Sequence, residues 1–512
     1  PMFQIMSPEQ AVGLIKDGDC IAINSFLALA NPNALHTALA ERFRQTGHPC
    51  GLELFCSSGF GGWDPELFAD QYISQGAVRK VVASHFASMP VVQKMAAENR
   101  IECYCLPLGT LSQCIRAAAA GQKVYLSKVG LNIFSDPRLD GPALNSCSKE
   151  ELVKVVRLEE EEYLLYKTPK IDVAFIKGTT VDPHGNISFE NEPVVADALA
   201  MAQATKNNGG KVIVQVEKVS HLFKRPWDVV VPGVLVDAVV VSQEMPEFQR
   251  ANPVLSGDIH VPASHMDYWM GQLRTSKKGG RPKADQSADI IGRRAAREMK
   301  AGDVVNIGIG IPETTGKYAS ELGVLKDVTL TVEAGGTGGL PAPGVIFGST
   351  IGADMATDMA SQFDFYDGGG LDICFMGGVE ADCRGNVNAH RMGDTYTGIG
   401  GFANITAATK TVIFCLTFSA KGLSAVMEGP EGVRIESEGS VPKFKKEIAA
   451  VSFSAKNALQ NGQRVLYVTE RCVFGLTPEG LALLEVYPGI DKKKDVLDRL
   501  EFPVKDLCEV CR

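Results

Sequence analysis

Short apolar runs alternate along the chain with amphipathic stretches of helical length. The segments DVVNIGIG (303–310) and DVTLTVEA (327–334) have the composition of strands, and PETTGKYASELG (312–323) between them predicts a helix that begins at a proline. LDICFMGG (371–378) and KTVIFCLTF (410–418) are two further expected strands. Strands that are apolar almost throughout are covered on both faces, so the pattern predicts an α/β fold with largely parallel sheets.

The chain also resembles itself at a constant offset of 200 residues. IDVAFIKGTTVDPHGNIS (171–188) and LDICFMGGVEADCRGNVN (371–388) share aspartate, phenylalanine, glycine and asparagine at matching positions. Earlier in the chain, LIKDGDCIAI (14–23) parallels EMKAGDVVNI (298–307). Self-similarity of this length indicates two copies of one domain.

The repeat predicts the domain organisation. We expect two tandem, related α/β/α domains at 1–245 and 290–512, each with a mainly parallel, mixed open sheet. The intervening segment 246–289 is rich in Pro, Gly, Ser and Lys and is interpreted as a linker. With 512 residues, of which 45% are hydrophobic and 22% charged, the chain can form two substantial cores.

Charge and cysteine usage exclude some classes of protein. A net charge of −9 argues against a nucleic-acid-binding surface, which would be basic. The most apolar stretch, 228–242, is interrupted by Pro232 and Asp237, so no membrane-spanning helix is expected, and PMFQIMSPEQ lacks the pattern of a signal peptide. The cysteines form no framework, and CEVC (Cys508, Cys511) has no second pair, so we interpret them as free thiols and expect no metal site and a cytoplasmic location.

A single carboxylate, Glu333, stands at the end of an expected strand and directly before glycines, in VEAGG. Ligands of parallel α/β sheets bind at the carboxyl ends of the strands. Three other glycine-containing segments are expected at such ends: GIG (308–310), GGVEAD (377–382) and TGIGGF (397–402). The residue opposite Glu333 in the first copy is Ser57. A carboxylate required by the fold would recur in both copies, so Glu333 is interpreted as functional.

A carboxylate among glycines can act as a nucleophile on an activated acyl group. Backbone N–H groups of GIGG (398–401) can stabilise the oxyanion of the tetrahedral state. A carboxylate needs a substrate with a good leaving group, and a thioester qualifies. Other chemistries have less support: NIGIGIP (306–312) lacks the third glycine of a dinucleotide-binding turn, and no G-x-S-x-G motif occurs. Asp354 and Asp358 share one helical face by spacing but are interpreted as solvated.

Several long segments, in the same order, resemble the family I coenzyme A transferases, particularly the fused acetate/propionate CoA-transferase type with both halves in one polypeptide. The resemblance covers nearly the whole chain. The segments that carry it are VEAGGTGGLPAPGVIFG (332–348), QFDFYDGGGLDICFMGGVEADCRGNVN (362–388), TGIGGFANI (397–405), YVTERCVF (467–474), IRAAAAG (115–121), FSDPR (134–138) and NNGGKVIVQVEKV (207–219).

The resemblance implies transfer of coenzyme A between a short-chain acyl-CoA and a free carboxylic acid, as in short-chain fatty acid metabolism. The implied mechanism is ping-pong, through a glutamyl-CoA thioester on Glu333. Gly400 and Gly401 would supply an oxyanion donor. The residues expected to contact coenzyme A are Gly308, Gly310, Asn386, Gly398, Ile399, Phe402 and Lys421.

The same resemblance implies no cofactor and no metal, because coenzyme A is itself a substrate that becomes transiently covalent. The expected partners are acyl-CoA and small carboxylic acids, with no nucleic acid and no membrane. A homo-oligomer, either dimer or tetramer, is also expected.

One position departs from the family pattern. Where the family usually reads P-Q-G, this chain has LPLG (106–109), so Leu108 replaces a glutamine whose side-chain amide helps to form the oxyanion hole. Loss of one such donor typically lowers the rate by about 10²–10³. Gln113 is nearby in sequence, but five residues on, and is not assumed to substitute. Two alternatives therefore stay open: an acyl-CoA hydrolase that uses the same glutamyl intermediate, and a catalytically weakened CoA-binding paralogue.

Overall fold

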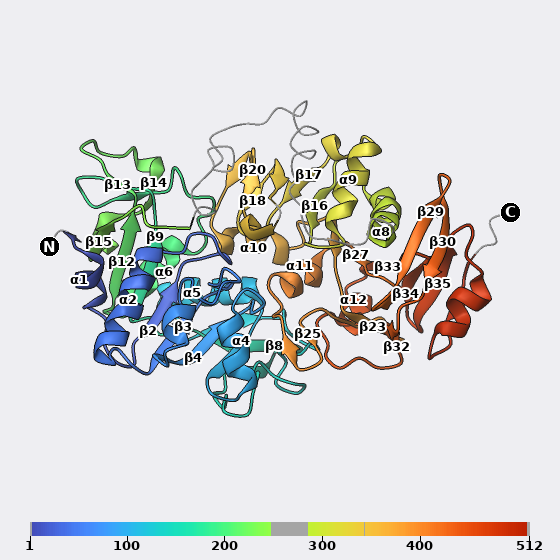
Figure 1. The fold of residues 1–512 in the computed structure, drawn as a ribbon, viewed down its shortest axis with the longest axis horizontal. Helices are drawn as coiled ribbons and strands as arrows, with labels where there is room; N and C mark the ends of the chain where they lie inside the picture. The colour runs from blue at the N-terminus through green and yellow to red at the C-terminus, as the bar shows by residue number, and fades with distance from the viewer. Residues whose placement is uncertain (1–2, 247–284, 343, 509–512) are drawn as a thin grey trace. The chain divides into compact units, whose positions relative to one another are not determined.

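The computed structural model describes residues 3–246, 285–342 and 344–508 (Figure 1). These residues form two compact units. The first unit contains the described residues up to 246, Val332–Asp364 and Asp394–Asn404. The second unit contains the described residues from 285 to Thr331, Phe365–Gly393, and those from Ile405 onward.

An eight-stranded parallel sheet forms the core of the first unit. Its strands, in sheet order, are β1 (Gln4–Ile5), β15 (Ala238–Val241), β12 (Lys211–Val216), β9 (Val173–Lys177), β2 (Cys20–Ile23), β3 (Leu52–Phe55), β4 (Val78–Ala83) and β5 (Glu102–Cys105). The central strands β9 and β2 are buried along their whole length. This burial confirms the prediction of apolar strands covered on both faces.

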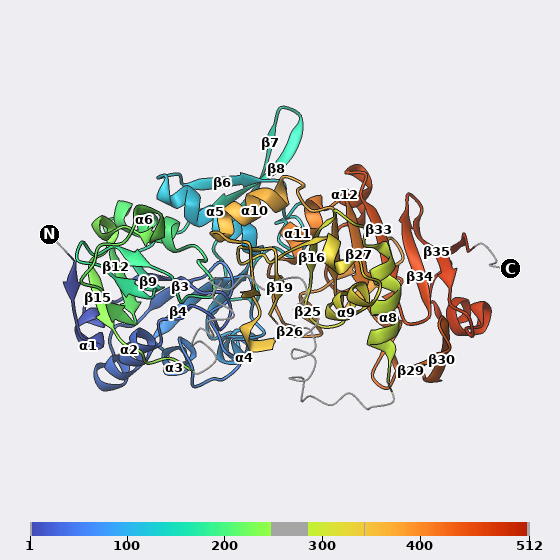
Figure 2. The ribbon, with the colours of Figure 1, turned by 90° about the horizontal axis from the view of Figure 1, so that it is seen from above.

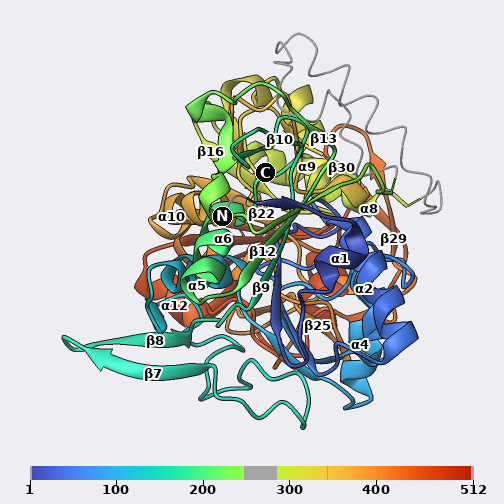
Figure 3. The same cartoon turned by 90° about the vertical axis from the view of Figure 1, so that its left-hand side faces the viewer.

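Helices cover both faces of this sheet. They are α1 (Pro8–Val12), α2 (Asn33–Thr46), α3 (Asp70–Ile73), α4 (Pro90–Ala97), α5 (Leu108–Ala119) and α6 (Ala198–Asn207). Figure 3 shows α1 and α2 on one side of the sheet and α5 and α6 on the other. Two further helices, α10 (Met359–Asp367) and α11 (Phe402–Ala408), begin within the first unit.

Smaller sheets complete the first unit. The antiparallel strands β6 (Val124–Ser127), β8 (Glu161–Lys167) and β7 (Val153–Leu158) form one of them, and the β7–β8 hairpin projects outward in Figure 2. A second has the order β13 (Lys218–Val219), β10 (Thr180–Val181), β11 (Ile187–Ser188), β14 (Val229–Val231). Two antiparallel pairs are β18 (Gly336–Thr337) with β21 (Met355–Ala356) and β19 (Leu340–Pro341) with β20 (Thr350–Ile351).

The second unit is built on a mixed sheet. From β17 onward, the strands of this sheet are, in order, β17 (Thr329–Thr331), β16 (Val304–Ile307), β22 (Ile373–Met376), β27 (Thr411–Cys415), β33 (Arg464–Val468), β34 (Cys472–Thr477), β35 (Gly480–Val486) and β36 (Lys505–Asp506). The pairs from β17 to β33 are parallel, whereas β34 pairs antiparallel with both of its neighbours. The helices of this unit include α8 (Ser287–Ala295), α9 (Glu313–Glu321) and α12 (Ala455–Gln460). A three-stranded sheet has the order β24 (Val387–Asn388), β23 (Glu380–Asp382), β32 (Phe444–Lys445).

The two sheets share one strand order, which confirms the repeat. β15-β12-β9-β2-β3 in the first unit corresponds to β33-β27-β22-β16-β17 in the second. The residues that are identical between the copies have the same structural role. Asp182 Oδ1 accepts from the N–H of Asn186 at 3.0 Å, and Asp382 Oδ1 accepts from the N–H of Asn386 at 2.9 Å. These identities therefore mark a polar turn that both copies need in order to fold.

Some expectations concern residues that the structure does not describe. Most of the expected linker 246–289 and Cys511 lie outside the described residues. The expected domain bounds stay a prediction, because compact units and the limits of a sequence repeat are different properties. Among the described residues, no helix combines the length and the apolar character needed to cross a membrane.

Candidate active site

Glu333 lies in a tight turn between β17 and β18, so the expected strand 327–334 ends earlier than its sequence indicates. The N–H of Val332 donates to the carbonyl oxygen of Gly336 at 2.8 Å, and the N–H of Gly335 donates to that of Val332 at 3.0 Å. Gly335 has φ +121°, and a Cβ there would lie 1.9 Å from the Thr357 carbonyl oxygen, so the turn requires glycine. The residue Glu333 is only 9% exposed.

Helix α10 links this turn to a second loop of the first unit. The Nε2 of Gln362 donates to the carbonyl oxygen of Val332 at 3.0 Å. The next residue, Phe363, lies against Gly109 at the start of α5. The N–H of Gly109 donates to Oδ1 of Asn404 at 3.0 Å, and Asn404 follows the expected glycine loop. Helix α10 therefore connects the Glu333 turn with the region of the glycine loop.

The expected glycine loop TGIGGF (397–402) runs along the end of β4 in the first unit. Thr397 accepts backbone hydrogen bonds from Phe86 and Ala87, and Gly398 forms a β-bridge with His85. Burial lowers the pKa of His85 to about 4, so this imidazole is neutral at physiological pH.

The predicted positions in this loop differ in burial and in hydrogen bonding. Ile399 and Phe402 are buried. The N–H of Gly400 donates to the carbonyl oxygen of Ser84 at 2.9 Å, so its donor capacity is used within the unit. Within the described part of the chain, the N–H of Gly401 makes no hydrogen bond. The oxyanion role expected of Gly400 and Gly401 stays a prediction, and the hydrogen bonding favours Gly401.

Leu108, the departure from the family pattern, is the first residue of α5 and is buried. Its N–H donates to the carbonyl oxygen of Gly400 at 3.0 Å. Gln113 does not replace the missing amide, because its Nε2 donates to the Ala360 carbonyl oxygen at 3.0 Å and to Oδ1 of Asp364 at 2.6 Å. Gln113 therefore anchors α10 to α5, and the position of Leu108 offers no side-chain donor.

A cavity of about 100 Å³ borders the Glu333 turn in the first unit. Its lining residues include Ala334, Gly336, Val194, Val195, Thr350 and the acidic residue Glu192. Its lining is mostly small and apolar. A cavity of this size suits a short acyl chain better than a large group.

Ser57, the residue opposite Glu333 in the first copy, is also in the equivalent structural position. It lies two residues after β3, as Glu333 lies two residues after β17. Ser57 is buried and its hydroxyl donates to Asp197, which also accepts from the hydroxyl of Ser112. Burial raises the pKa of Asp197 to about 6.

This buried network is a part of the site region that sequence reasoning missed. Asp197 precedes α6, which is a helix-start signal, yet its carboxylate bonds to serines that lie far away in sequence. The N–H of Asp197 donates to Oδ1 of Asn24 at 2.8 Å. No local sequence pattern indicates these hydrogen-bond partners, because they come together only when the strands pair.

The remaining predicted CoA contacts lie in the second unit. Gly308 follows β16 and donates to the Phe375 carbonyl oxygen at 2.8 Å, and Gly310 precedes α9. Lys421 is exposed, just after the short strand β28 (Ser419–Ala420). The structure thus assigns Glu333 and the glycine loop to one unit and these residues to the other.

Asn386 has a full structural role of its own. Its Nδ2 donates to Asp382 at 2.9 Å, and its Oδ1 accepts from the N–H of Ala455 at 2.9 Å. Asn186 repeats both bonds in the first copy, with Asp182 and Gly233. The turn alone accounts for Asn386, and its expected contact with coenzyme A stays a prediction.

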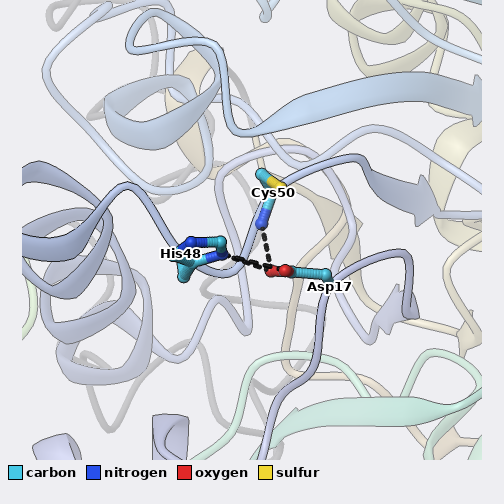
Figure 4. A group of neighbouring side chains, drawn as sticks. All are labelled: Asp17, His48 and Cys50. Atoms are coloured by element: carbon cyan, nitrogen blue, oxygen red, sulfur yellow. Dashed lines mark hydrogen bonds and ion pairs between the residues drawn. The ribbon is translucent and has the colours of Figure 1, made fainter.

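One group of possible metal ligands occurs in the part of the chain that the structure describes: Asp17, His48 and Cys50 (Figure 4). Asp17 accepts from the Cys50 N–H and pairs with Nδ1 of His48, both at 2.8 Å. The Cys50 N–H, and then His48, lower the pKa of the Asp17 carboxyl group. These bonds join two surface turns and explain the group without a metal.

Comparisons with known proteins define the class. The sequence profile of the family described as Coenzyme A transferase matches residues 5–242 and 289–489. The chain therefore belongs to the coenzyme A transferase family, and it is a CoA-transferase with both halves in one polypeptide, as the repeat and the resemblance predict.

Full-length relatives agree with this assignment. The chain is 39% identical over 512 residues to the caffeate CoA-transferase of Acetobacterium woodii, covering 98% of this chain and 94% of the relative. It is 38% identical over 507 residues to the acetate CoA-transferase YdiF of Escherichia coli, covering 97% and 92%.

Solved structures of YdiF from Escherichia coli O157:H7 have the same fold. The apoenzyme matches with a TM-score of 0.89 at 36% identity, covering 99% of this chain and 94% of that one. A YdiF thioester complex with CoA matches with a TM-score of 0.87 over the same shares of the two chains. These matches confirm the predicted α/β fold.

Proposed function

We propose that this enzyme transfers coenzyme A between a short-chain acyl-CoA and a free carboxylic acid by a ping-pong mechanism through Glu333. The observation that carries the proposal is the position of Glu333: a buried carboxylate in a glycine turn beside a small apolar cavity. The family assignment and the thioester complex of the related YdiF support it. The proposed substrates are acyl-CoA and small carboxylic acids, and acetate is the acid named for that relative.

In the first half-reaction, an oxygen of the Glu333 carboxylate attacks the thioester carbonyl carbon. The C–S bond breaks, coenzyme A leaves as a thiolate, and a mixed anhydride forms. The thiolate then attacks the glutamyl carbonyl and expels the acyl group as a carboxylate, which leaves a glutamyl-CoA thioester. A second carboxylate reverses these steps and leaves as its CoA ester.

The chain's own residues meet three requirements of this reaction. Burial of Glu333 removes water from the nucleophile, and the glycine turn lets the substrate approach the backbone closely. The N–H of Gly401 is the proposed oxyanion donor, since that of Gly400 is bonded to Ser84. The proposed contacts of Gly308, Gly310, Asn386, Gly398, Ile399, Phe402 and Lys421 would hold coenzyme A.

Leu108 bears on the rate and on the choice between transfer and hydrolysis. The side-chain donor usual in the family is absent here, because Leu108 has none, and Gln113 is committed to α10. We therefore expect Leu108→Gln to raise kcat by between about tenfold and a hundredfold, with KM for acyl-CoA little changed. An unchanged or lower kcat in a folded variant would show that the position contributes no oxyanion donor in this chain.

Intact-protein mass spectrometry tests the central intermediate. We would mix the enzyme with propionyl-CoA without an acceptor acid and look for an adduct of coenzyme A less one water. Peptide mapping should place the adduct on Glu333, and added acetate should discharge it as acetyl-CoA. Glu333→Ala should lack the adduct, and Asp354→Asn, which changes an exposed carboxylate of the same segment, should keep it.

The outcomes distinguish the alternatives that the sequence leaves open. Thiol release that depends on Glu333, with no thioester formed on any acceptor acid, would identify a hydrolase. Binding of acyl-CoA without adduct or turnover would identify a non-catalytic paralogue. An adduct on another residue would overturn the role of Glu333. The cytoplasmic location and the absence of a cofactor stay proposals beside this mechanism.

A further inference from the structure

One buried side chain holds both ends of the turn that carries Glu333. Gln362 lies on α10 in the first unit and is 3% exposed. Its Nε2 donates to the carbonyl oxygen of Val332 at 3.0 Å and to that of Gly336 at 3.3 Å. Val332 directly precedes Glu333, and Gly336 lies three residues after it. A single amide group therefore bridges the two ends of the segment 332–336, which we call the Glu333 turn.

A primary amide suits this position because it carries two N–H bonds on one nitrogen. Both acceptors are carbonyl oxygens, so the atom of Gln362 that faces them must be the nitrogen and not the oxygen. Backbone bonds already close the turn, from the N–H of Val332 to Gly336 at 2.8 Å and from the N–H of Gly335 to Val332 at 3.0 Å. What Gln362 adds is a fixed position of this closed turn relative to α10.

The helix that carries Gln362 is itself anchored to the first copy of the repeat. The N–H of Met359, the first residue of α10, donates to the carbonyl oxygen of Ala196 at 3.0 Å. The Nε2 of Gln113 on α5 donates to the carbonyl oxygen of Ala360 at 3.0 Å. Two bonds from distant parts of the chain thus fix α10, and Gln362 fixes the Glu333 turn to α10.

The first copy holds its equivalent turn without such an amide. There the hydroxyl of Ser84 lies 2.6 Å from the carbonyl oxygen of Ser57 and 3.1 Å from that of Ser58. A hydroxyl has one O–H bond, so it donates fully to only one of these oxygens. The shared strand and turn therefore do not require a side chain with two donors. The copy that has one is also the copy that has the proposed nucleophile.

The bond to Val332 bears directly on the direction of the Glu333 side chain. A peptide group is planar, so the Val332 carbonyl oxygen lies in one plane with the N and Cα atoms of Glu333. A donor held on that oxygen restricts rotation of the plane and therefore orients the Cα–Cβ bond of Glu333. The carboxylate must reach the carbonyl carbon of a thioester, and a misplacement of about 1 Å can lower a rate by about 10².

We propose that Gln362 is a positioning residue for the nucleophile: its amide holds the carbonyl oxygens of Val332 and Gly336 so that the Glu333 carboxylate is placed for attack on the acyl-CoA thioester. This role rests on the proposed function of Glu333. Gln362 acts through Glu333 and not on the substrate, so it should affect the rate of the chemical steps and leave the binding of acyl-CoA unchanged.

Kinetics of the full chain with propionyl-CoA and acetate test this role. Gln362→Met has a side chain of similar length and no donor. It should lower kcat by about 10²-fold and change KM for propionyl-CoA by less than about threefold. In a single turnover followed by mass spectrometry, the variant should still form the coenzyme A adduct on Glu333, but about 10²-fold more slowly than the wild type. The split between kcat and KM distinguishes positioning from a lost substrate contact.

Gln463 provides a matched control in the second unit. Its Nε2 also bridges two backbone carbonyl oxygens, those of Thr406 and Thr409, both at 2.8 Å. Gln463→Met therefore removes the same kind and number of hydrogen bonds, and urea unfolding should show that both variants are folded and less stable than the wild type. Gln463→Met should keep kcat within about twofold of the wild type.

Three results would overturn this role and leave the proposed function intact. The first is a folded Gln362→Met with the kcat and the adduct rate of the wild type. The second is an equal loss of kcat in Gln463→Met, because lower stability would then explain both losses. The third is a raised KM with an unchanged kcat, which would make Gln362 a contact for the substrate. A wild type that forms no adduct on Glu333 has a different meaning, because the proposed function and the role of Gln362 would then both fail.

Discussion

The two copies of the repeat share a strand order and a polar turn. They differ at one equivalent position, which lies two residues after β3 in the first copy and two residues after β17 in the second. In the first copy this residue is Ser57, which bonds to a buried aspartate and has a structural role. In the second copy it is Glu333, a buried carboxylate in a glycine turn beside a cavity. The same backbone position is thus used for packing in one copy and for the proposed chemistry in the other.

The two copies can also be compared at positions outside the candidate active site. Asp182 and Asp382, with Asn186 and Asn386, repeat each other bond for bond because both copies need the turn. Features that recur report on folding, and features found in one copy point to function.

The largest expected effect follows from removing the side chain at each of the two equivalent positions. Glu333→Ala should lower kcat/KM by about 10⁴ or more, because it removes the proposed nucleophile. Ser57→Ala should lower it by less than about tenfold and act mainly through stability, because it removes one donor to Asp197. Steady-state kinetics with propionyl-CoA and acetate would measure both. Equal losses in the two folded variants would contradict the division of roles.

The next effect separates two glycines of one loop. A Cβ at Gly398 would lie 2.4 Å from the Ser84 carbonyl oxygen, at φ +86°, whereas Gly400 has open space at φ +52°. Gly398→Ala should therefore lower the free energy of unfolding by about 3–5 kcal/mol, and Gly400→Ala by about 1 kcal/mol. Urea unfolding of both variants would check the ranking. Similar losses would show that the loop relaxes around a new side chain.

The buried Asp197 predicts a pH-dependent difference. Its pKa is raised to about 6 in the folded protein from an ordinary value of 3.8, so the carboxyl group favours the native state below pH 4 and loses this advantage as the pH rises through 6. The free energy of unfolding of the wild type, relative to Asp197→Asn, should fall by about 2 kcal/mol between pH 4 and pH 7. Unfolding curves at a series of pH values would measure this. A difference independent of pH would show that Asp197 does not titrate there.

The smallest effect compares the two asparagines of the repeated turn. Asn186→Ala and Asn386→Ala should each lower the free energy of unfolding by about 1–2 kcal/mol, because each removes the same two hydrogen bonds. If Asn386 also binds coenzyme A, only Asn386→Ala should raise KM for acyl-CoA. Identical KM values in the two variants would assign Asn386 to the turn alone.

Local pattern was enough to predict much of the fold. The alternation of apolar runs and amphipathic stretches predicts β16, α9, β22 and β27, and the 200-residue offset predicts two related sheets. Each of these features depends on residues close in sequence or on direct comparison of two segments. The turn after Glu333 can be predicted from its glycines for the same reason, because the turn is local.

The partners across long distances were not predictable. Asp197 meets Ser57 and Ser112 only after the parallel strands pair, and Gln113 is committed to α10 only because α10 packs on α5. The structure also groups Val332–Asp364, with Glu333, together with residues of the first copy, although the sequence repeat assigns it to the second.

The sequence by itself determined the class of fold, the repeat, the family and the residue proposed as nucleophile. Those properties depend on local periodicity, on self-comparison and on motifs that stay contiguous in the chain. Only the tertiary structure decided which donors are already used, such as the N–H of Gly400 and the amide of Gln113, and which apolar residues stay exposed, such as Trp227. The physical reason is that hydrogen-bond partners and burial are set by residues that chain folding brings together from distant positions.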